Sequence, residues 1–229
     1  MAQLEQYFTA TFAVGASDAT SHVVTGFPAI SVGSSVLITG VYYYFSATYA
    51  ANITNLAVND GTNIVPVFLS ASGSLTNNSI PIITSNSQFI MVPGDTLQYV
   101  FNNGNAGNLT IYVFYKLIGG QSNPDSLIYG SIKNVATTNV NFVIPSIGNN
   151  VAFYKSLIIT NNAATANFDL AYNSVTTFKS VRIPTLTSNI CIGGPEYLYE
   201  TIGQVLGVGT LSTDYSYYLS YYYDPLYTL

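Results

Sequence analysis

The sequence predicts an all-β protein built from two tandem antiparallel β-sandwich domains. Strand-favouring residues dominate, whereas Glu, Lys, Arg, Gln and Met are scarce. Apolar and polar residues alternate in one segment after another, and clusters of Gly, Asn and Pro separate these segments at a spacing of roughly 8 to 12 residues. No segment carries a convincing apolar stripe at helical spacing, so the pattern favours a sandwich or barrel.

The first half shows the alternation most clearly at its start. In the segment YFTATFAV, Phe8, Ala10 and Phe12 face one way while Tyr7 and its polar neighbours face the other. Turn sequences such as VNDGTN and VPGDT lie between the alternating segments. The further predicted strands of this half are residues 21–27, 35–47, 88–93, 95–101 and 108–118.

The second half resembles the first. Residues 53–59 align with residues 167–173 at an offset of 114 and share Leu-Ala-x-Asn. An apolar strand precedes this segment in each half, and a glycine-turned hairpin and a tyrosine-rich strand follow it. We therefore expect a first domain over residues 1–120 and a repeat of it over residues 121–229. The boundary falls in the stretch GGQSNPD, which is short enough to hold the two domains close together.

Two sandwich topologies fit each half. Eight short strands in about 110 residues suit a jelly roll, and seven suit an immunoglobulin-like sandwich. The chain has no Trp and a single Cys, so the Trp and the cysteine pair of an antibody-type domain are absent. This favours the jelly roll and leaves the immunoglobulin-like topology as the alternative.

The composition is poor in charge. Only 5 of 229 residues are Lys or Arg and 10 are Asp or Glu, whereas the chain holds 20 Tyr and 22 Asn. Direct nucleic-acid binding is not expected, because it needs many cationic contacts to phosphate. No stretch offers the ~20 continuous apolar residues of a transmembrane helix, and the N-terminus lacks the basic and apolar regions of a signal peptide.

Few residues could carry catalysis or hold a cofactor. The single histidine, His22, is expected on the solvent face or edge of a strand, with no nucleophile motif beside it. Asp60 and Asp95 lie in turns that contain glycine. Asp is favoured in such turns, so the turns account for both residues without a catalytic role. Glu196 and Glu200 would lie about 13 Å apart on a strand, too far for a catalytic carboxylate pair. We expect no enzyme activity, no metal and no cofactor.

Tyrosine-rich strands are the most informative surface feature. Residues 215–223 carry aromatic side chains on both strand faces, and a single sandwich can bury only one of them. The other face should meet a neighbouring domain or subunit, where tyrosine is favoured because it is both apolar and hydrogen-bonding. Residues 41–45 show the same pattern. The alternative explanation is a strand whose two faces are both buried within the chain. The candidate interface residues are Tyr42, Tyr44, Tyr215, Tyr217, Tyr218, Tyr221, Tyr222 and Tyr223.

The low charge, the abundance of Tyr, Asn, Ile and Thr, and the two tandem halves resemble one known group of proteins. These are the structural virion proteins of Sulfolobus turreted icosahedral virus and related archaeal viruses of hot environments. The resemblance implies a capsid or vertex-turret subunit that forms homo-oligomers around a symmetry axis, a pentamer among them, with other capsid proteins as partners. It also implies a surface that contacts host glycans or a receptor, and it transfers no functional residue.

The length of the chain bears on this interpretation. A major capsid protein with two jelly rolls is usually longer than this chain, which favours a turret or vertex role. The alternatives are a subunit of a cell-surface or pilus-like filament, which should carry an export signal, and a carbohydrate-binding module that uses exposed tyrosines.

Overall fold

The structure is a computed structural model. It describes residues 4–47, 51–71, 79–83, 88–120, 127–136, 140–142, 150–161, 166–172, 175–183, 189–193, 199–200, 206–210 and 215–228. All regular elements in these ranges are β-strands, and none of the described residues is helical. The predicted all-β class is confirmed.

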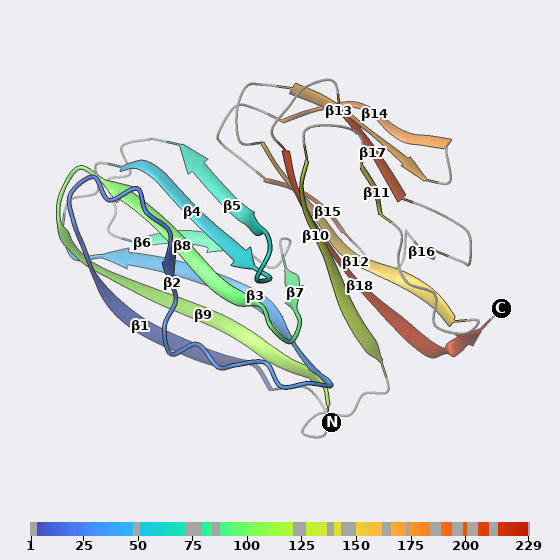
Figure 1. Ribbon diagram of the computed structural model, residues 1–229, viewed down its shortest axis with the longest axis horizontal. Helices are drawn as coiled ribbons and strands as arrows, with labels where there is room; N and C mark the ends of the chain where they lie inside the picture. The colour runs from blue at the N-terminus through green and yellow to red at the C-terminus, as the bar shows by residue number, and fades with distance from the viewer. Residues whose placement is uncertain are drawn as a thin grey trace.

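The first half of the chain forms one sandwich of two antiparallel sheets (Figure 1). One sheet has the order β1-β9-β3-β6, with β7 also paired to β3, and the other has the order β2-β8-β4-β5. The strands are β1 (Gln6–Val14), β2 (His22–Val23), β3 (Ser34–Phe45), β4 (Ala51–Asn59), β5 (Ile64–Ala71), β6 (Ser79–Ile83), β7 (Phe89–Met91), β8 (Thr96–Asn103) and β9 (Gly107–Gly119).

The second half forms another sandwich. One sheet has the order β10-β18-β12-β15, with β16 also paired to β12, and the other has the order β11-β17-β13-β14. The strands are β10 (Ile128–Ala136), β11 (Val140–Phe142), β12 (Asn150–Asn161), β13 (Ala166–Tyr172), β14 (Val175–Ile183), β15 (Asn189–Gly193), β16 (Tyr199–Glu200), β17 (Leu206–Thr210) and β18 (Tyr215–Thr228).

The strand order settles the topology in favour of the jelly roll. If β6 and β7 count as two parts of one strand, since both pair with β3, the first half reads 1-8-3-6 and 2-7-4-5. The second half gives the same two orders when β15 and β16 are counted together. Both sheets are then connected as in a jelly roll, and no described strand pairs across the two halves.

One predicted strand is much shorter than its alternation indicated. Residues 21–27 were expected to form a strand, but β2 holds only His22 and Val23. The chain turns at Gly26, whose φ of 84° is a conformation that side-chain-bearing residues rarely adopt. Alternation alone does not reveal that the backbone leaves the sheet here.

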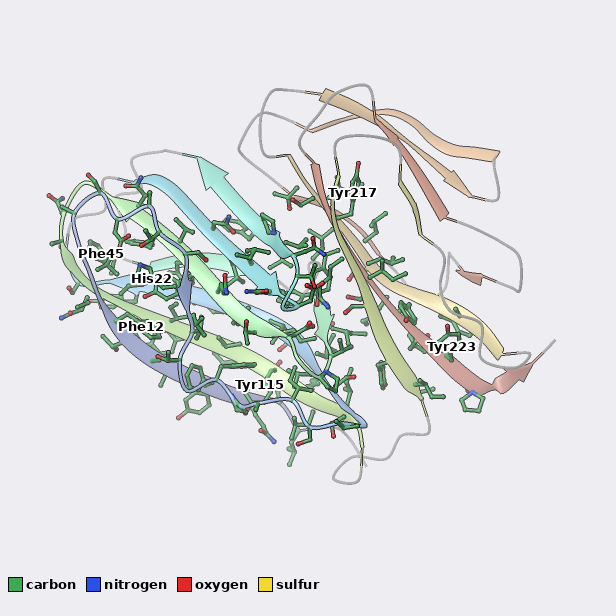
Figure 2. The ribbon with its side chains drawn as sticks, viewed as in Figure 1. Phe12, His22, Phe45, Tyr115, Tyr217 and Tyr223 are labelled. Carbon is green, nitrogen blue, oxygen red and sulfur yellow. The ribbon has the colours of Figure 1, made fainter. Side chains whose placement is uncertain are left out.

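The core of the first sandwich lies between its two sheets, where inward residues alternate along each strand (Figure 2). Tyr43 and Phe101 pack edge to face with ring centroids 6.0 Å apart, and Phe45 lies against the same ring at 5.0 Å. This cluster continues without a break into Ile158 and Tyr218 of the second half. The two sandwiches therefore share buried apolar surface.

Candidate interaction surfaces

The second half covers an open side of the first. Strands β5 and β7 are edge strands of the two sheets of the first sandwich, and β10, β12 and β18 lie against them (Figure 1). An uncovered edge presents backbone N–H and C=O groups that can pair with another chain. We call this contact the seam, and its second-half residues are Ser131, Lys133, Ser156, Ile158, Thr160, Tyr218 and Ser220.

Side-chain hydroxyls of the seam cap the backbone of β7. The Ile90 N–H donates to Ser220 Oγ at 2.9 Å, and the Tyr218 hydroxyl donates to the Ile90 carbonyl at 2.6 Å. Ser156 Oγ donates to the carbonyl of Gln88 at 2.7 Å. Buried backbone groups need such partners, because leaving one unpaired costs about 1–3 kcal/mol. The capped edge is closed to further strand pairing.

The same sheet caps β5. Thr160 Oγ1 donates to the Pro66 carbonyl at 3.0 Å. Pro66 lacks an N–H and so leaves only its carbonyl to satisfy on this edge. Beside these polar contacts, Ile158 and Tyr218 are fully buried and supply the apolar part of the seam.

A buried ion pair crosses the seam. Lys133 Nζ lies 2.9 Å from Asp95 Oδ1, and the two side chains are only 4% and 2% exposed. The other carboxylate oxygen accepts the Val92 N–H at 2.9 Å, which fixes the turn between β7 and β8. Lys133 also lies 5.3 Å from the centre of the Tyr218 ring. Burial raises the pKa of Asp95, and Lys133 opposes that rise.

Tyr218 is a neutral hydrogen-bond donor in this setting. Complete burial and the nearby Asp95 carboxylate raise its pKa well above the ordinary value of 10.0. Its hydroxyl therefore keeps its proton at neutral pH and can donate to the Ile90 carbonyl.

A second aromatic surface is exposed on the first sandwich. Strands β1, β9 and β3 carry Tyr7, Phe114, Tyr42, Tyr112 and Tyr44 on their outer face, and we call this set the aromatic face. The strand register places these side chains next to one another. Tyr7 lies opposite Phe114 on the neighbouring strand, and Tyr42 lies opposite Tyr112. The rings of Tyr42 and Phe114 pack edge to face at 5.7 Å. Tyr7 is 70%, Tyr42 42%, Tyr44 41% and Tyr112 37% exposed.

The structure distributes the predicted interface tyrosines over three environments. Tyr42 and Tyr44 belong to the exposed aromatic face. Tyr218 lies in the seam, in contact with the neighbouring sandwich of the same chain.

The remaining predicted tyrosines belong to β18, and Figure 2 labels two of them, Tyr217 and Tyr223. Tyr217, Tyr221 and Tyr223 are buried, so within this chain they have almost no surface left for a second subunit. Tyr222 is half-buried and stacks on Phe153 at 5.3 Å. The side chain of Tyr215 lies outside the described residues.

Several of the residues that form these surfaces were not predicted from the sequence. The pairing of Lys133 with Asp95 joins two halves of the chain, and the turn context of Asp95 concealed it. Tyr7 and Tyr112 were not singled out, although the alternation of YFTATFAV already placed Tyr7 on the face opposite Phe8. Following that signal across neighbouring strands requires the strand register.

His22 and Asp60, which were considered for catalysis, have structural partners. His22 lies on edge strand β2, with Nε2 2.9 Å from Asp18 Oδ2. The Thr20 hydroxyl and N–H, together with His22, lower the pKa of Asp18 to about 2. Asp60 accepts the N–H groups of Thr62 and the residue after it in a tight turn, as predicted. Glu196 and the side chain of Glu200 lie outside the described residues.

The described residues offer neither a metal-binding cluster nor a membrane-spanning helix. They hold no cluster of three or more His, Cys, Asp or Glu side chains that could bind a metal ion. Within the same ranges, no helix is long and apolar enough to cross a membrane.

Comparisons with known proteins identify no family. No family model and no curated protein matches the sequence. Among solved structures, the major capsid protein P2 of bacteriophage PM2 is 7% identical over 96% of this chain and 97% of its own, with a TM-score of 0.38.

Two further structures align over similar lengths. The glycosylasparaginase PNGase F of Flavobacterium meningosepticum is 10% identical over 96% of this chain and 95% of its own, with a TM-score of 0.45. A chain of Sulfolobus turreted icosahedral virus is 11% identical over 96% of this chain and 90% of its own, with a TM-score of 0.34. Scores this low carry no inference about function.

Proposed function

We propose that the protein is a non-enzymatic structural subunit of a virus particle, which assembles with copies of itself and with other capsid proteins. The observation that carries the proposal is the aromatic face on a pair of jelly rolls packed against each other. Four of its tyrosines keep more than a third of their surface exposed in the single chain. Their register makes them one continuous patch, and such patches mark interaction sites.

The chemistry of this face suits assembly. Tyrosine contributes a large apolar area and one hydroxyl, and aromatic residues are enriched at the centre of protein interfaces. The chain carries only 15 charged residues. Association would therefore rest on apolar burial and hydrogen bonds, so it should depend little on salt concentration.

We also propose the finer assignments. The domains are residues 1–120 and 121–229, the second a repeat of the first, which the matching strand orders support. Within the particle the protein would occupy a vertex or turret and contact the host surface.

Purified particles test the proposal directly. Mass spectrometry should find the chain at a fixed stoichiometry that survives repeated gradient purification, and cryo-electron microscopy should place two stacked jelly rolls in the shell or at its vertices. Absence of the chain from the particles, together with a monodisperse monomer at high concentration, would overturn the assignment. Density in the main shell, away from the vertices, would overturn only the turret role.

A further inference from the structure

The aromatic face and the seam occupy equivalent positions in the two halves. Strands β3 and β9 shift register between Ile38 and Gly40, and strands β12 and β18 shift between Tyr154 and Ser156. Aligning these two irregularities matches Gly40 with Ser156. Counting onward along β3 and β12, Tyr42 then corresponds to Ile158 and Tyr44 to Thr160.

The correspondence extends across the neighbouring strand. Tyr42 lies opposite Tyr112, whereas Ile158 lies opposite Tyr218. Tyr112 of β9 therefore corresponds to Tyr218 of β18. By the same counting Phe114 corresponds to Ser220.

The first strand of each half completes the match. Tyr7 lies opposite Phe114, and Ser131 lies opposite Ser220. Every member of the aromatic face thus has a counterpart in the seam. The pairs are Tyr7 and Ser131, Tyr42 and Ile158, Tyr44 and Thr160, Tyr112 and Tyr218, and Phe114 and Ser220.

The two equivalent surfaces differ in how much of them is buried. Ile158 and Tyr218 are fully buried because the seam covers β5 and β7. Their counterparts Tyr42 and Tyr112 are 42% and 37% exposed. One copy of the surface has its partner inside the chain, and in the single chain the other copy remains on the outside.

Among the described residues, no strand pairs along the equivalent edge of the second half either. By strand order, β14 corresponds to β5 and β16 to β7. No described strand pairs along the outer edge of β14 or β16. Figure 1 shows β14 on the side of the second sandwich that faces away from the first. Within the described part of the chain, the first sandwich therefore has one exposed face and the second has one edge to which no strand is paired.

We propose that the aromatic face of one copy packs on the β14 and β16 edge of a second copy, repeating the seam between molecules. Tyr112 would donate its hydroxyl to a backbone carbonyl of β16, as Tyr218 does to β7. Tyr44 would face β14 near Thr176, because Thr176 lies opposite Ala171 as Pro66 lies opposite Ala57. This deepens the proposed function by naming the surfaces through which the subunit assembles.

The contact joins two different surfaces, so it is head-to-tail. Such contacts close into a ring when the rotation between copies allows it and otherwise continue as a filament. An isologous dimer, in which two aromatic faces meet, would use the same tyrosines but would leave the β14 edge free.

The first test removes the aromatic face. The variant Y42S/Y112S should assemble at least tenfold more weakly than the parent when measured by mass photometry and sedimentation velocity. The matched control is V32S, since Val32 is 95% exposed but lies outside the face, and it should assemble like the parent. Unchanged circular dichroism would show that the double variant is folded. Unaltered assembly of the folded variant would overturn the inference.

The second test identifies the partner edge. In a C191S background, chains carrying Tyr44→Cys are mixed with chains carrying Thr176→Cys and exposed to a short thiol cross-linker. Covalent dimers should form in the mixture and be at least tenfold rarer with either chain alone. The mixture of Val32→Cys and Thr176→Cys chains is the control and should give few.

The outcomes separate this inference from the proposed function. Dimers from Tyr44→Cys chains alone would show the isologous arrangement and overturn the head-to-tail contact. Assembly into particles without the mixed cross-link would overturn the contact and leave the structural role standing. A chain that never self-associates and is absent from particles would remove both.

Discussion

Replacing Lys133 by Met should strongly weaken the contact between the two sandwiches. The substitution leaves Asp95, only 2% exposed, without its partner at 2.9 Å. Breaking a buried ion pair from one side costs about 3–5 kcal/mol. The Val92 N–H still solvates one carboxylate oxygen, so we expect the lower part of that range. At about 2–4 °C per kcal/mol for a chain of this size, the midpoint of thermal unfolding should fall by roughly 6–12 °C.

The pH dependence of this loss of stability shows whether it comes from the unpaired Asp95 carboxylate. Burial raises the pKa of Asp95 above the ordinary value of 3.8. A carboxyl group with a raised folded pKa favours folding when it is protonated, and this contribution disappears as the pH rises through the folded pKa. Without Lys133 the pKa should rise further, because the opposing charge is gone. The K133M variant should therefore lose most stability near neutral pH and recover part of it in acid.

Urea unfolding followed by circular dichroism, at several values of pH, measures the effect. The control is K133M combined with Asp95→Asn, which removes both charges and keeps an acceptor for the Val92 N–H. The double variant should regain most of the lost stability, since replacing both partners of a buried pair is often neutral. If K133M costs less than about 1 kcal/mol and shows no pH dependence, the pair behaves like an exposed one and the reasoning is refuted.

Three further predictions follow from the described contacts. Y218F removes the donor to the Ile90 carbonyl and should cost about 1–3 kcal/mol in urea unfolding; no change would mean that the carbonyl finds another partner. G130A places a methyl group against the ring opposite it on β18 and should cost about 1–3 kcal/mol, with shifted aromatic NMR signals. NMR titration should give Asp18 a pKa of about 2, and T20A should raise it; its stabilising effect is present in full above the ordinary pKa of 3.8 and is lost as the pH falls from there through about 2.

The sequence allowed the architecture to be predicted in some detail. Period-2 alternation located β1, β3 and β9 because each buries one face in a sandwich. The Leu-Ala-x-Asn alignment matched residues 53–59 with 167–173, and these segments contribute to β4 and β13, which occupy the same place in the strand order. Alternation failed at residues 21–27, because the departure from the sheet depends on the turn at Gly26.

The surfaces were harder to predict because they depend on register between distant strands. The aromatic area of both faces of β18 was recognised, but the sequence does not tell whether a buried face meets another part of the same chain or a different molecule. Lys133 and Asp95 come together only because β10 lies against the turn after β7. Neither residue has a neighbour in sequence that reveals the pair.

The covalent connection between the sandwiches sets an order of events. The linker consists of residues 121–126. It joins Gly120, which follows β9, to Leu127, which precedes β10. A linker this short holds the seam surfaces at an effective concentration in the millimolar range. The seam therefore forms at any protein concentration, whereas a contact between chains needs a threshold amount of subunit. In the proposed assembly the chain would complete its own edge first, and growth between molecules would begin only once enough finished subunits had accumulated.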